Sequence, residues 1–233
     1  MNPGQLHITV SVVTYKTTRG IQREGLCSNY LKRTIPVVPE EEDEIILEEK
    51  ATKVQLFVIP NVHFRLPTNN PSDHAILMFA IGSGLAPFRS FWQELQTFQC
   101  SKTNNEVKRV LFMGCRTPDD FLHAEELQTL MTTTEENEQI FTDIIPVFSR
   151  GNNGAKRYIQ HAMLDYEQLI YSMITKDNSF IYMCGSTRAC QSIESALASI
   201  LETSSQDKRS TKEANDYVQK LKQTGVIKQD MFG

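Results

Sequence analysis

The sequence predicts an α/β protein in which a doubly wound parallel sheet follows a smaller β-rich part. The first observation is a series of short apolar runs after Pro71, each with the length of a buried parallel strand. The second is that a helical pattern follows each run, so crossover connections, which are right-handed, must join the strands. The third is a change of rhythm near residue 70, where alternating β-type sequence ends. The runs are His74–Ile81, Val107–Gly114, Ile140–Phe148 and Ser179–Cys184.

The β-rich first part gives an expected division into two domains, residues 1–70 and 71–233. Leu6–Tyr15 and Val54–Ile59 are rich in β-branched and aromatic residues and alternate at period two. Both are therefore expected to be strands of a small barrel or sheet. Between them lies an acidic stretch, residues 40–49. It could dock a basic partner, but a solvated loop is the favoured interpretation.

The helices of the second part follow from apolar periodicity. In the first of them, five apolar side chains recur at steps of three and four residues, and the helix is expected to begin near Pro87. Those side chains are Phe88, Phe91, Trp92, Leu95 and Phe98. Further helices are expected at about residues 120–131, 156–174, 187–201 and 211–224, and a short tail follows the last one.

Composition excludes several classes of protein. The 233 residues are 40% hydrophobic and carry a formal net charge of −4, whereas a nucleic-acid binder would show a basic excess. No apolar run approaches the roughly 18 residues of a membrane span, and the start does not have the pattern of a signal peptide. Five cysteines without CxxC spacing argue against structural zinc and for a reducing compartment, so a cytoplasmic location is expected.

The ends of the first two predicted strands carry residues suited to phosphate. Gly82, Ser83 and Gly84 precede the helix near Pro87, where a tight backbone turn and free helix amides favour a pyrophosphate site over a mere turn. Arg116 follows the second strand, and its fixed charge suits phosphate or carboxylate. Cys115, beside it, reads most simply as a small buried side chain.

The third strand end offers a different set of groups. Ser149, Arg150 and Lys156 could hold a phosphomonoester, and Tyr158 could stack on adenine, which together would select a 2′-phosphorylated dinucleotide. A solubilising basic surface is the alternative. After the fourth strand, Cys184 either contacts a ligand or is a buried structural cysteine. The final residues, 230–233, are either frayed or fold their aromatic side chain over a flat cofactor.

These signals, in this order, resemble the carboxyl-terminal part of the diflavin reductases, and more broadly the ferredoxin-NADP reductase superfamily. That family includes NADPH-hemoprotein reductase, the reductase half of nitric oxide synthase, the sulfite reductase flavoprotein and methionine synthase reductase. Four blocks carry the resemblance: GSGLAPFRSFWQE, VLFMGCRTPDDFLHAEEL, VFSRGNNGAKRYIQH and IYMCGS. A fifth block, EGLCSNYL, resembles the segment that holds the FAD pyrophosphate.

The resemblance implies a partial β-barrel FAD-binding domain followed by an NADP-binding domain, and it implies a role for individual residues. Gly25, Cys27 and Ser28 would bind FAD. The pyrophosphate and ribose of NADPH would lie near Gly82, Ser83, Pro87 and Arg116, and its 2′-phosphate and adenine near Ser149, Arg150, Lys156, Tyr158 and Gln160.

The resemblance also assigns residues to the path of hydride transfer. By resemblance, Cys184 and Asp230 flank the path from nicotinamide to flavin, and Phe232 is the terminal aromatic side chain that stacks on the flavin ring. A Phe at this place is more like the nitric oxide synthase reductases than like the hemoprotein reductases, which carry Trp. The sequence also departs from the family, because Ser186 replaces an acidic residue and Ser83 replaces a threonine.

The implied activity is that of an NADPH-dependent flavoprotein reductase. Hydride would pass to FAD, and electrons would continue to FMN in a flavodoxin-like domain or partner, and then to a heme protein or other acceptor. The family's flavin-gripping R-x-Y-S segment is absent from the sequence, so the chain is expected to be part of a longer protein. The alternative hypothesis is a redox-inactive module of the same fold that binds a nucleotide or a partner.

Overall fold

The computed structural model describes residues 6–34, 54–98, 107–132, 139–150, 156–204 and 207–232. Its contacts divide the described chain into two units, one over Leu6–Pro60 and one that begins at Asn61. Each unit is described by itself. The expected division into two domains at residue 70 stays a prediction. The acidic stretch at residues 40–49 lies outside the described residues.

The described part of the first unit contains a short hairpin and a helix. Strand β1 (Thr14–Lys16) pairs antiparallel with β2 (Gln22–Glu24), and helix α1 (Leu26–Arg33) follows. The expected strand over Leu6–Tyr15 is therefore wrong in extent, and residues 54–59 form no strand. β-Branched sequence favours a strand only where a neighbouring edge pairs with it, and in the described part of this unit only the hairpin supplies one.

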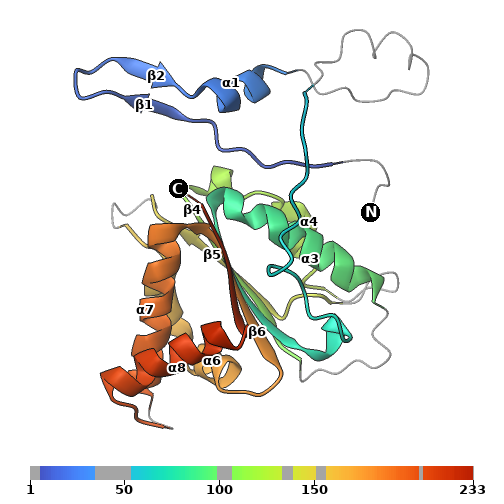
Figure 1. Cartoon of the computed structure of the whole chain (residues 1–233), viewed down its shortest axis with the longest axis vertical. Helices are drawn as coiled ribbons and strands as arrows, with labels where there is room; N and C mark the ends of the chain where they lie inside the picture. Colours follow the sequence, from blue (N-terminus) through green and yellow to red (C-terminus); the bar gives the residue numbers. More distant parts are fainter. Residues whose placement is uncertain are drawn as a thin grey trace. The chain divides into compact units, whose positions relative to one another are not determined.

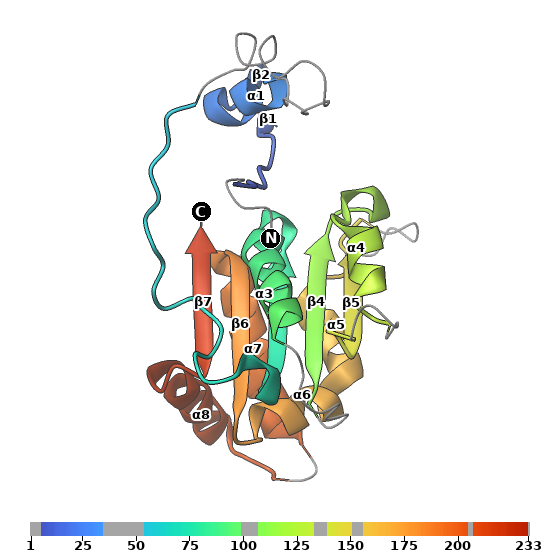
Figure 2. The same ribbon diagram turned by 90° about the vertical axis from the view of Figure 1, so that its right-hand side faces the viewer.

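The second unit is built on a parallel sheet, which confirms the predicted fold class (Figure 2). Four of its strands match the predicted apolar runs: β3 (Ala75–Ile81), β4 (Arg109–Cys115), β5 (Asp143–Phe148) and β6 (Ser179–Ser186). The strand order is β5-β4-β3-β6-β7, and every neighbouring pair is parallel. This is the doubly wound order: strands β3, β4 and β5 are added towards one edge of the sheet, and β6 and β7 are added on the other side of β3. The strand order therefore reverses between β3 and β6, and we call this place the reversal point.

The fifth strand corrects the expectation of a short tail. Residues Ile227–Phe232 form β7, which pairs parallel with β6 over six residues from Ile181↔Ile227 to Ser186↔Phe232. Gly225, with φ of 74°, takes the left-handed turn just before Val226 that separates the preceding helix from this strand. The last residues are therefore part of the sheet.

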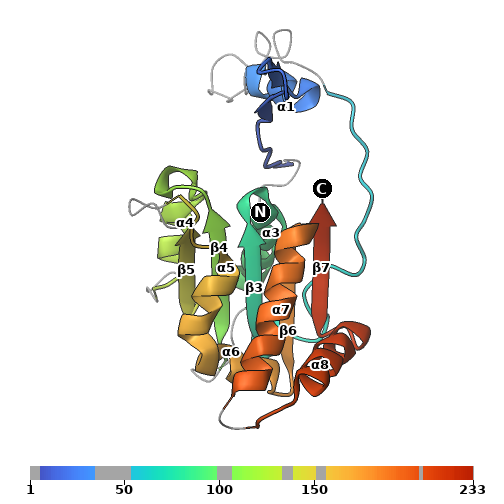
Figure 3. The same cartoon turned by 90° about the vertical axis from the view of Figure 1, so that its left-hand side faces the viewer.

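Helices cover both faces of the sheet (Figures 1 and 3). Helices α3 (Ala86–Thr97) and α4 (Ala124–Thr129) lie on one face. The other face carries α5 (Ile159–Ala162), α6 (Glu167–Ile174), α7 (Thr187–Thr203) and α8 (Thr211–Gln223). Short 3-10 helices lie in the connections between these elements: η1 (Pro71–Asp73), η2 (Gly82–Leu85), η3 (Pro118–Asp120) and η4 (Met163–Tyr166).

Two of the predicted helices are interrupted. The helix expected at residues 120–131 consists of η3 and α4, because His123 between them has a left-handed φ of 58°. The helix expected at residues 156–174 consists of α5, η4 and α6. A left-handed residue cannot continue a right-handed helix, and sequence periodicity does not reveal such a break.

The core has one apolar cluster on each face of the sheet. The predicted stripe on α3 is confirmed for Phe88, Phe91, Trp92 and Leu95, which are all buried, whereas Phe98 lies beyond the helix and is 37% exposed. Burial of each such side chain contributes roughly 1.5–3 kcal/mol. Within the described ranges, no helix combines the length and the apolar character that crossing a membrane requires.

The segment just before the sheet is fixed to β6 and β7. Phe64 and Leu66 are buried with α3, and the ring of Phe64 lies 5.5 Å from that of Tyr182 in an edge-on arrangement. The backbone carbonyl of Arg65 accepts hydrogen bonds from the Tyr182 hydroxyl at 2.8 Å and from Lys228 Nζ at 2.9 Å. Residues 64–66 are thus tied to the two strands that carry Cys184 and Asp230.

The turn after β3 lies very close to the backbone of β6. A methyl group added at Gly84 would lie 2.2 Å from the carbonyl oxygen of Cys184 and 2.6 Å from its carbonyl carbon. These are backbone atoms, so they cannot rotate away. Gly84 is therefore required because of close packing between η2 and β6.

We expect Gly84→Ala to lower the free energy of unfolding by about 1–3 kcal/mol, because the added methyl group overlaps backbone atoms. Urea unfolding followed by circular dichroism measures the loss. Ser83→Ala in the same turn is the matched control, since Ser83 is only partly buried, and it should change stability by no more than about 0.5 kcal/mol. Equal stability of the Gly84 variant and the wild type would contradict the close approach.

Candidate functional site

The candidate site lies at the edge where the parallel strands end. The arrowheads of β4 and β7 point to this edge (Figure 2), and every neighbouring pair of strands is parallel. Strands β3 and β6 lie side by side at the point where the strand order reverses. Ligands of doubly wound sheets bind outside the carboxyl ends of the strands at this point. The loops that follow β3 and β6 are therefore central, and those after β4, β5 and β7 flank them.

The loop after β3 combines two glycines with different functions. Gly82 has a left-handed φ of 57°, and a methyl group added to it would meet no heavy atom within 4 Å. Its backbone is therefore open to a ligand. Gly84 is buried against Cys184, so its role in the loop is packing. Pro87 is half-buried at the second position of α3, where its missing amide costs no hydrogen bond.

The loops after β4 and β5 run side by side. The amide of Ser149 donates to the carbonyl of Cys115 at 2.9 Å, and the amide of Arg150 donates to the carbonyl of Arg116 at 2.8 Å. Parallel pairing thus extends one step beyond the strands and places two arginines on adjacent chains. Both arginines are exposed, which concentrates positive charge on this part of the edge.

Asp120 orients the guanidinium of Arg116. Nη2 of Arg116 lies 2.9 Å from Oδ1 of Asp120, and the side chain of Arg116 is 65% exposed. Hydrogen bonds from Thr117 and from Arg116 lower the pKa of Asp120. The carboxylate therefore stays ionised at neutral pH, and the exposed guanidinium keeps donors that can face an anion.

The chain returns to the same edge after residues 151–155, which lie outside the described part. Lys156 and Tyr158 are exposed, with Tyr158 at 44%, and Tyr158 is the residue that precedes α5. Ile159 packs against the end of β4, since a methyl group added at Gly114 would lie 3.1 Å from its side chain. This packing fixes Tyr158 and Gln160 beside the strand that leads to Arg116.

The residues that the resemblance assigns to the hydride path occupy neighbouring positions on β6 and β7. Cys184 is in register with Asp230, and Ser186 is in register with Phe232. Cys184 is only 3% exposed, whereas Phe232 is 46% exposed. Burial raises the pKa of the Cys184 thiol to about 12, and the neighbouring groups of Asp230 and Cys190 add to the shift. The thiol is therefore neutral at pH 7 and suits a wall of the site, not a nucleophile.

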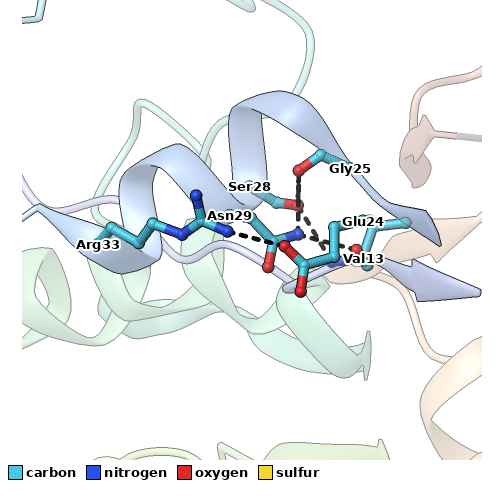
Figure 4. Close-up of polar contacts among 6 residues, drawn as sticks. All are labelled: Val13, Glu24, Gly25, Ser28, Asn29 and Arg33. Carbon is cyan, nitrogen blue, oxygen red and sulfur yellow. Dashed lines mark hydrogen bonds and ion pairs between the residues drawn. The ribbon is translucent and has the colours of Figure 1, made fainter. Parts of the chain in front are cut away.

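The candidate residues of the first unit form a separate, local network (Figure 4). The Ser28 hydroxyl accepts a hydrogen bond from the Val13 amide at 3.1 Å and contacts the Gly25 carbonyl at 3.4 Å. The Asn29 side-chain amide donates to the carbonyls of Val13 and Gly25, both at 2.9 Å. The network ties the start of α1 to the chain that leads into β1. Cys27, in the first turn, is exposed.

Sequence reasoning missed several residues that support the site. Asn29 is one, and Glu126 is another: its carboxylate accepts hydrogen bonds from Arg89 Nε at 3.0 Å and Trp92 Nε1 at 2.8 Å, which joins α4 to α3. A third is Glu194, which contacts β7. None of these has a distinguishing sequence signal, because each contact joins residues that are distant along the chain or depends on a turn.

A parallel sheet of this order, with a glycine loop where the strand order reverses and basic loops beside it, is typical of a dinucleotide-binding domain. Residues 78–195, more than half of the chain, match the family described as "Oxidoreductase NAD-binding domain", and the chain belongs to this family.

The relatives confirm the resemblance to the diflavin reductases. The chain is 28% identical to a nitric oxide synthase of Anopheles stephensi over 98% of its own length. It is 30% identical to an NADPH–cytochrome P450 reductase of Drosophila melanogaster over 95% of its length. An inducible nitric oxide synthase of Mus musculus is 29% identical over 99%. The chain spans 17%, 30% and 18% of the lengths of these relatives, respectively.

We expect the cysteines to differ sharply in reactivity. Iodoacetamide at about pH 8 should alkylate Cys27, which is exposed, and leave Cys184 unmodified because its thiol is buried and has a raised pKa. Peptide mass spectrometry after a timed quench measures both sites. The same treatment in denaturant should alkylate both, which controls for intrinsic reactivity. Alkylation of Cys184 at the rate of Cys27 in the folded chain would contradict its placement.

Proposed function

We propose that this chain is an NADPH-dependent flavoprotein oxidoreductase module that binds NADPH and passes hydride to FAD. The observation that carries the proposal is spatial: the described residues of four sequence blocks that resemble those of the diflavin reductases lie at the carboxyl ends of four adjacent parallel strands, β5, β4, β3 and β6. Electrons then continue to FMN and to a heme or other acceptor in a nitric oxide synthase-like or hemoprotein reductase-like protein. The phenylalanine at position 232 supports the first of these two parents.

The pyrophosphate of NADPH is assigned to the loop after β3. The open left-handed turn at Gly82 and the amides of η2 offer backbone donors, and Ser83 adds a hydroxyl. Pro87 sets the start of α3 behind the loop, and Gly84 holds the loop against β6. Arg116, steadied by Asp120, supplies the charge that a pyrophosphate or ribose oxygen would meet.

The 2′-phosphate and adenine are assigned to the loops after β4 and β5. Arg150 is fixed to the Arg116 strand by its backbone hydrogen bond, and its exposed guanidinium forms charge-assisted bonds best with a phosphate. Ser149 and Lys156 add a hydroxyl and an ammonium group. Tyr158 is exposed enough to stack on adenine, and Gln160 follows it on α5.

The nicotinamide is assigned to the ends of β6 and β7. When bound, NADPH supplies a hydride and FAD accepts it. The neutral, buried Cys184 lines the path without competing as a nucleophile. Asp230, next to it in register, stabilises the positive charge that develops on the nicotinamide ring. The half-exposed ring of Phe232 lies at the end of β7, where it can cover a flavin and must move to admit nicotinamide.

FAD is assigned to the first unit, around Gly25, Cys27 and Ser28. The fit is partial: the first turn of α1 presents free backbone amides, but the Ser28 hydroxyl is engaged with Val13. We therefore assign the FAD phosphates to backbone amides of α1, and Ser28 to holding this helix in place. Gly25 is needed at the turn because an added methyl would lie 2.9 Å from the Val13 side chain.

The partners follow from the same proposal. The acceptor of electrons from FAD is an FMN-binding flavodoxin-like domain or protein, and a heme protein or other acceptor lies beyond it. A cytoplasmic location fits this role. A redox-inactive nucleotide-binding module is the second candidate, and the engaged Ser28 hydroxyl favours it because it leaves fewer groups for FAD.

Calorimetric titration with NADP+ and separately with NAD+ tests the nucleotide part of the proposal. We expect NADP+ to bind more tightly, because Ser149, Arg150 and Lys156 meet only the 2′-phosphate. Equal affinity for the two nucleotides would remove the assignment of these loops. Failure of a folded chain to bind either one would contradict the proposal as a whole.

The variant Arg150→Ala should weaken NADP+ binding by on the order of 1.5–3 kcal/mol and leave NAD+ binding nearly unchanged, because the lost contact is charge-assisted and specific to the 2′-phosphate. Arg157→Ala is the matched control. Arg157 is a neighbouring exposed arginine, but it pairs with Asp165 and should leave both affinities unchanged. Equal losses for both nucleotides in the Arg150 variant would refute its role.

Anaerobic mixing of the chain with FAD and then NADPH separates the two candidate functions. A redox module should bleach the absorbance of the oxidised flavin faster than free FAD and NADPH react in buffer. Asp230→Asn should slow this step and leave the affinity for NADPH nearly unchanged, because the nicotinamide of NADPH is neutral and the carboxylate acts on the charge that develops during hydride transfer. No acceleration by a chain that binds both cofactors would favour the redox-inactive candidate.

A further inference from the structure

Strand β7 carries two of the proposed hydride-side residues although it lies at the edge of the sheet. It pairs with β6 on one side only, so its backbone hydrogen bonds fix it less firmly than those of β3. Met231 and Phe232, at its end, are both 46% exposed. Edge segments with few buried contacts open at low free energy. The position of Asp230 and Phe232 therefore depends on what else holds this strand.

Side chains hold β7 from both faces of the sheet. Alternation along a strand puts Lys228, Asp230 and Phe232 on one face and Gln229 and Met231 on the other. On the first face, Lys228 Nζ donates to the Arg65 carbonyl. On the second face, Gln229 Nε2 lies 2.5 Å from Oε1 of Glu194, which belongs to α7. Gln229 immediately precedes Asp230.

The Glu194 carboxylate joins three elements at one point. Besides Gln229, it accepts two hydrogen bonds from Lys222 Nζ of α8, at 3.0 Å and 2.9 Å. Only 15% of the Glu194 side chain and 31% of the Lys222 side chain are exposed. A partly buried, bidentate pair has a defined geometry, unlike a surface ion pair. The amide of Gln229 adds a neutral donor to the same carboxylate, so β7 is fixed to both helices.

We propose that Glu194 is a positioning residue for the nicotinamide end of the site. By holding Gln229, it keeps the end of β7 paired with β6, and it thereby sets Asp230 beside Cys184 and Phe232 beside Ser186. The inference rests on the proposed function, because it assumes that nicotinamide and Phe232 compete for the end of β6. Glu194 itself touches neither cofactor in this assignment and acts only through β7.

Hydrogen–deuterium exchange of the whole chain tests the contact without any ligand. The variant Gln229→Leu removes the tie to Glu194 but keeps the Glu194–Lys222 pair, and Glu194→Ala removes both. Each should raise the exchange rate of peptide amides at residues 227–232 about tenfold, since a hydrogen bond to a charged group is lost. Glu202→Ala is the matched control, because Glu202 lies on the same helix but contacts Thr211 at the start of α8.

Affinities for two nucleotides measure the effect of the contact on the nicotinamide end of the site. The wild type and the three variants are titrated with NADP+ and with 2′,5′-ADP, which carries the 2′-phosphate but no nicotinamide. Affinity for 2′,5′-ADP should stay the same in all four proteins. The ratio of NADP+ affinity to 2′,5′-ADP affinity should rise severalfold in Gln229→Leu and Glu194→Ala, because Phe232 leaves the end of β6. Glu202→Ala should keep the wild-type ratio.

The outcomes separate the inference from the proposed function. Faster exchange at residues 227–232 together with a raised affinity ratio supports the positioning role. Unchanged exchange in the Gln229 variant, or faster exchange with an unchanged ratio, overturns it while wild-type nucleotide binding stands. A wild-type chain that binds neither NADP+ nor 2′,5′-ADP refutes the proposed function, and the positioning role is refuted with it.

Discussion

The site depends on the central position of β3 in the sheet. This strand pairs in parallel with β4 on one side and β6 on the other, and from Ala75 to Ala80 its side chains are buried. Where it ends, Gly84 lies directly against the carbonyl of Cys184. Only a residue without a side chain permits this contact, so the reversal point and the candidate pyrophosphate loop are fixed by one steric constraint.

The loops after β4 and β5 are positioned by the strands that they follow. Backbone hydrogen bonds carry the pairing of β4 and β5 past the strands, which sets Arg116 and Arg150 on adjacent chains. Asp120 then orients one guanidinium and leaves it exposed. The site is thus assembled from rigid strand ends and charged side chains. Under the proposed function, such an arrangement would need little reorganisation to bind a polyanion.

The carboxyl-terminal strand links the architecture to the proposed chemistry. Its face towards α3 carries Lys228, which holds residues 64–66, and Asp230, which lies beside Cys184. Its other face meets Glu194 through Gln229. A single short edge strand therefore connects the segment that follows the first unit, two helices and the candidate nicotinamide position. The proposed hydride step relies on these contacts because orientation is the main contribution of a protein that holds a flavin and a nicotinamide.

The sequence by itself determined the parallel fold, four of the five strands, the helix at Pro87 and the diflavin reductase resemblance. Apolar runs and periodic stripes encode these locally. Only the tertiary structure decided that residues 227–232 form a strand, that Leu6–Tyr15 and Val54–Ile59 largely do not, and that Ser28 is engaged with Val13. A segment forms a strand only where a neighbouring strand pairs with it. The role of a side chain depends on contacts with residues distant in the sequence, such as that of Glu194 with Gln229. Neither is written in the local pattern.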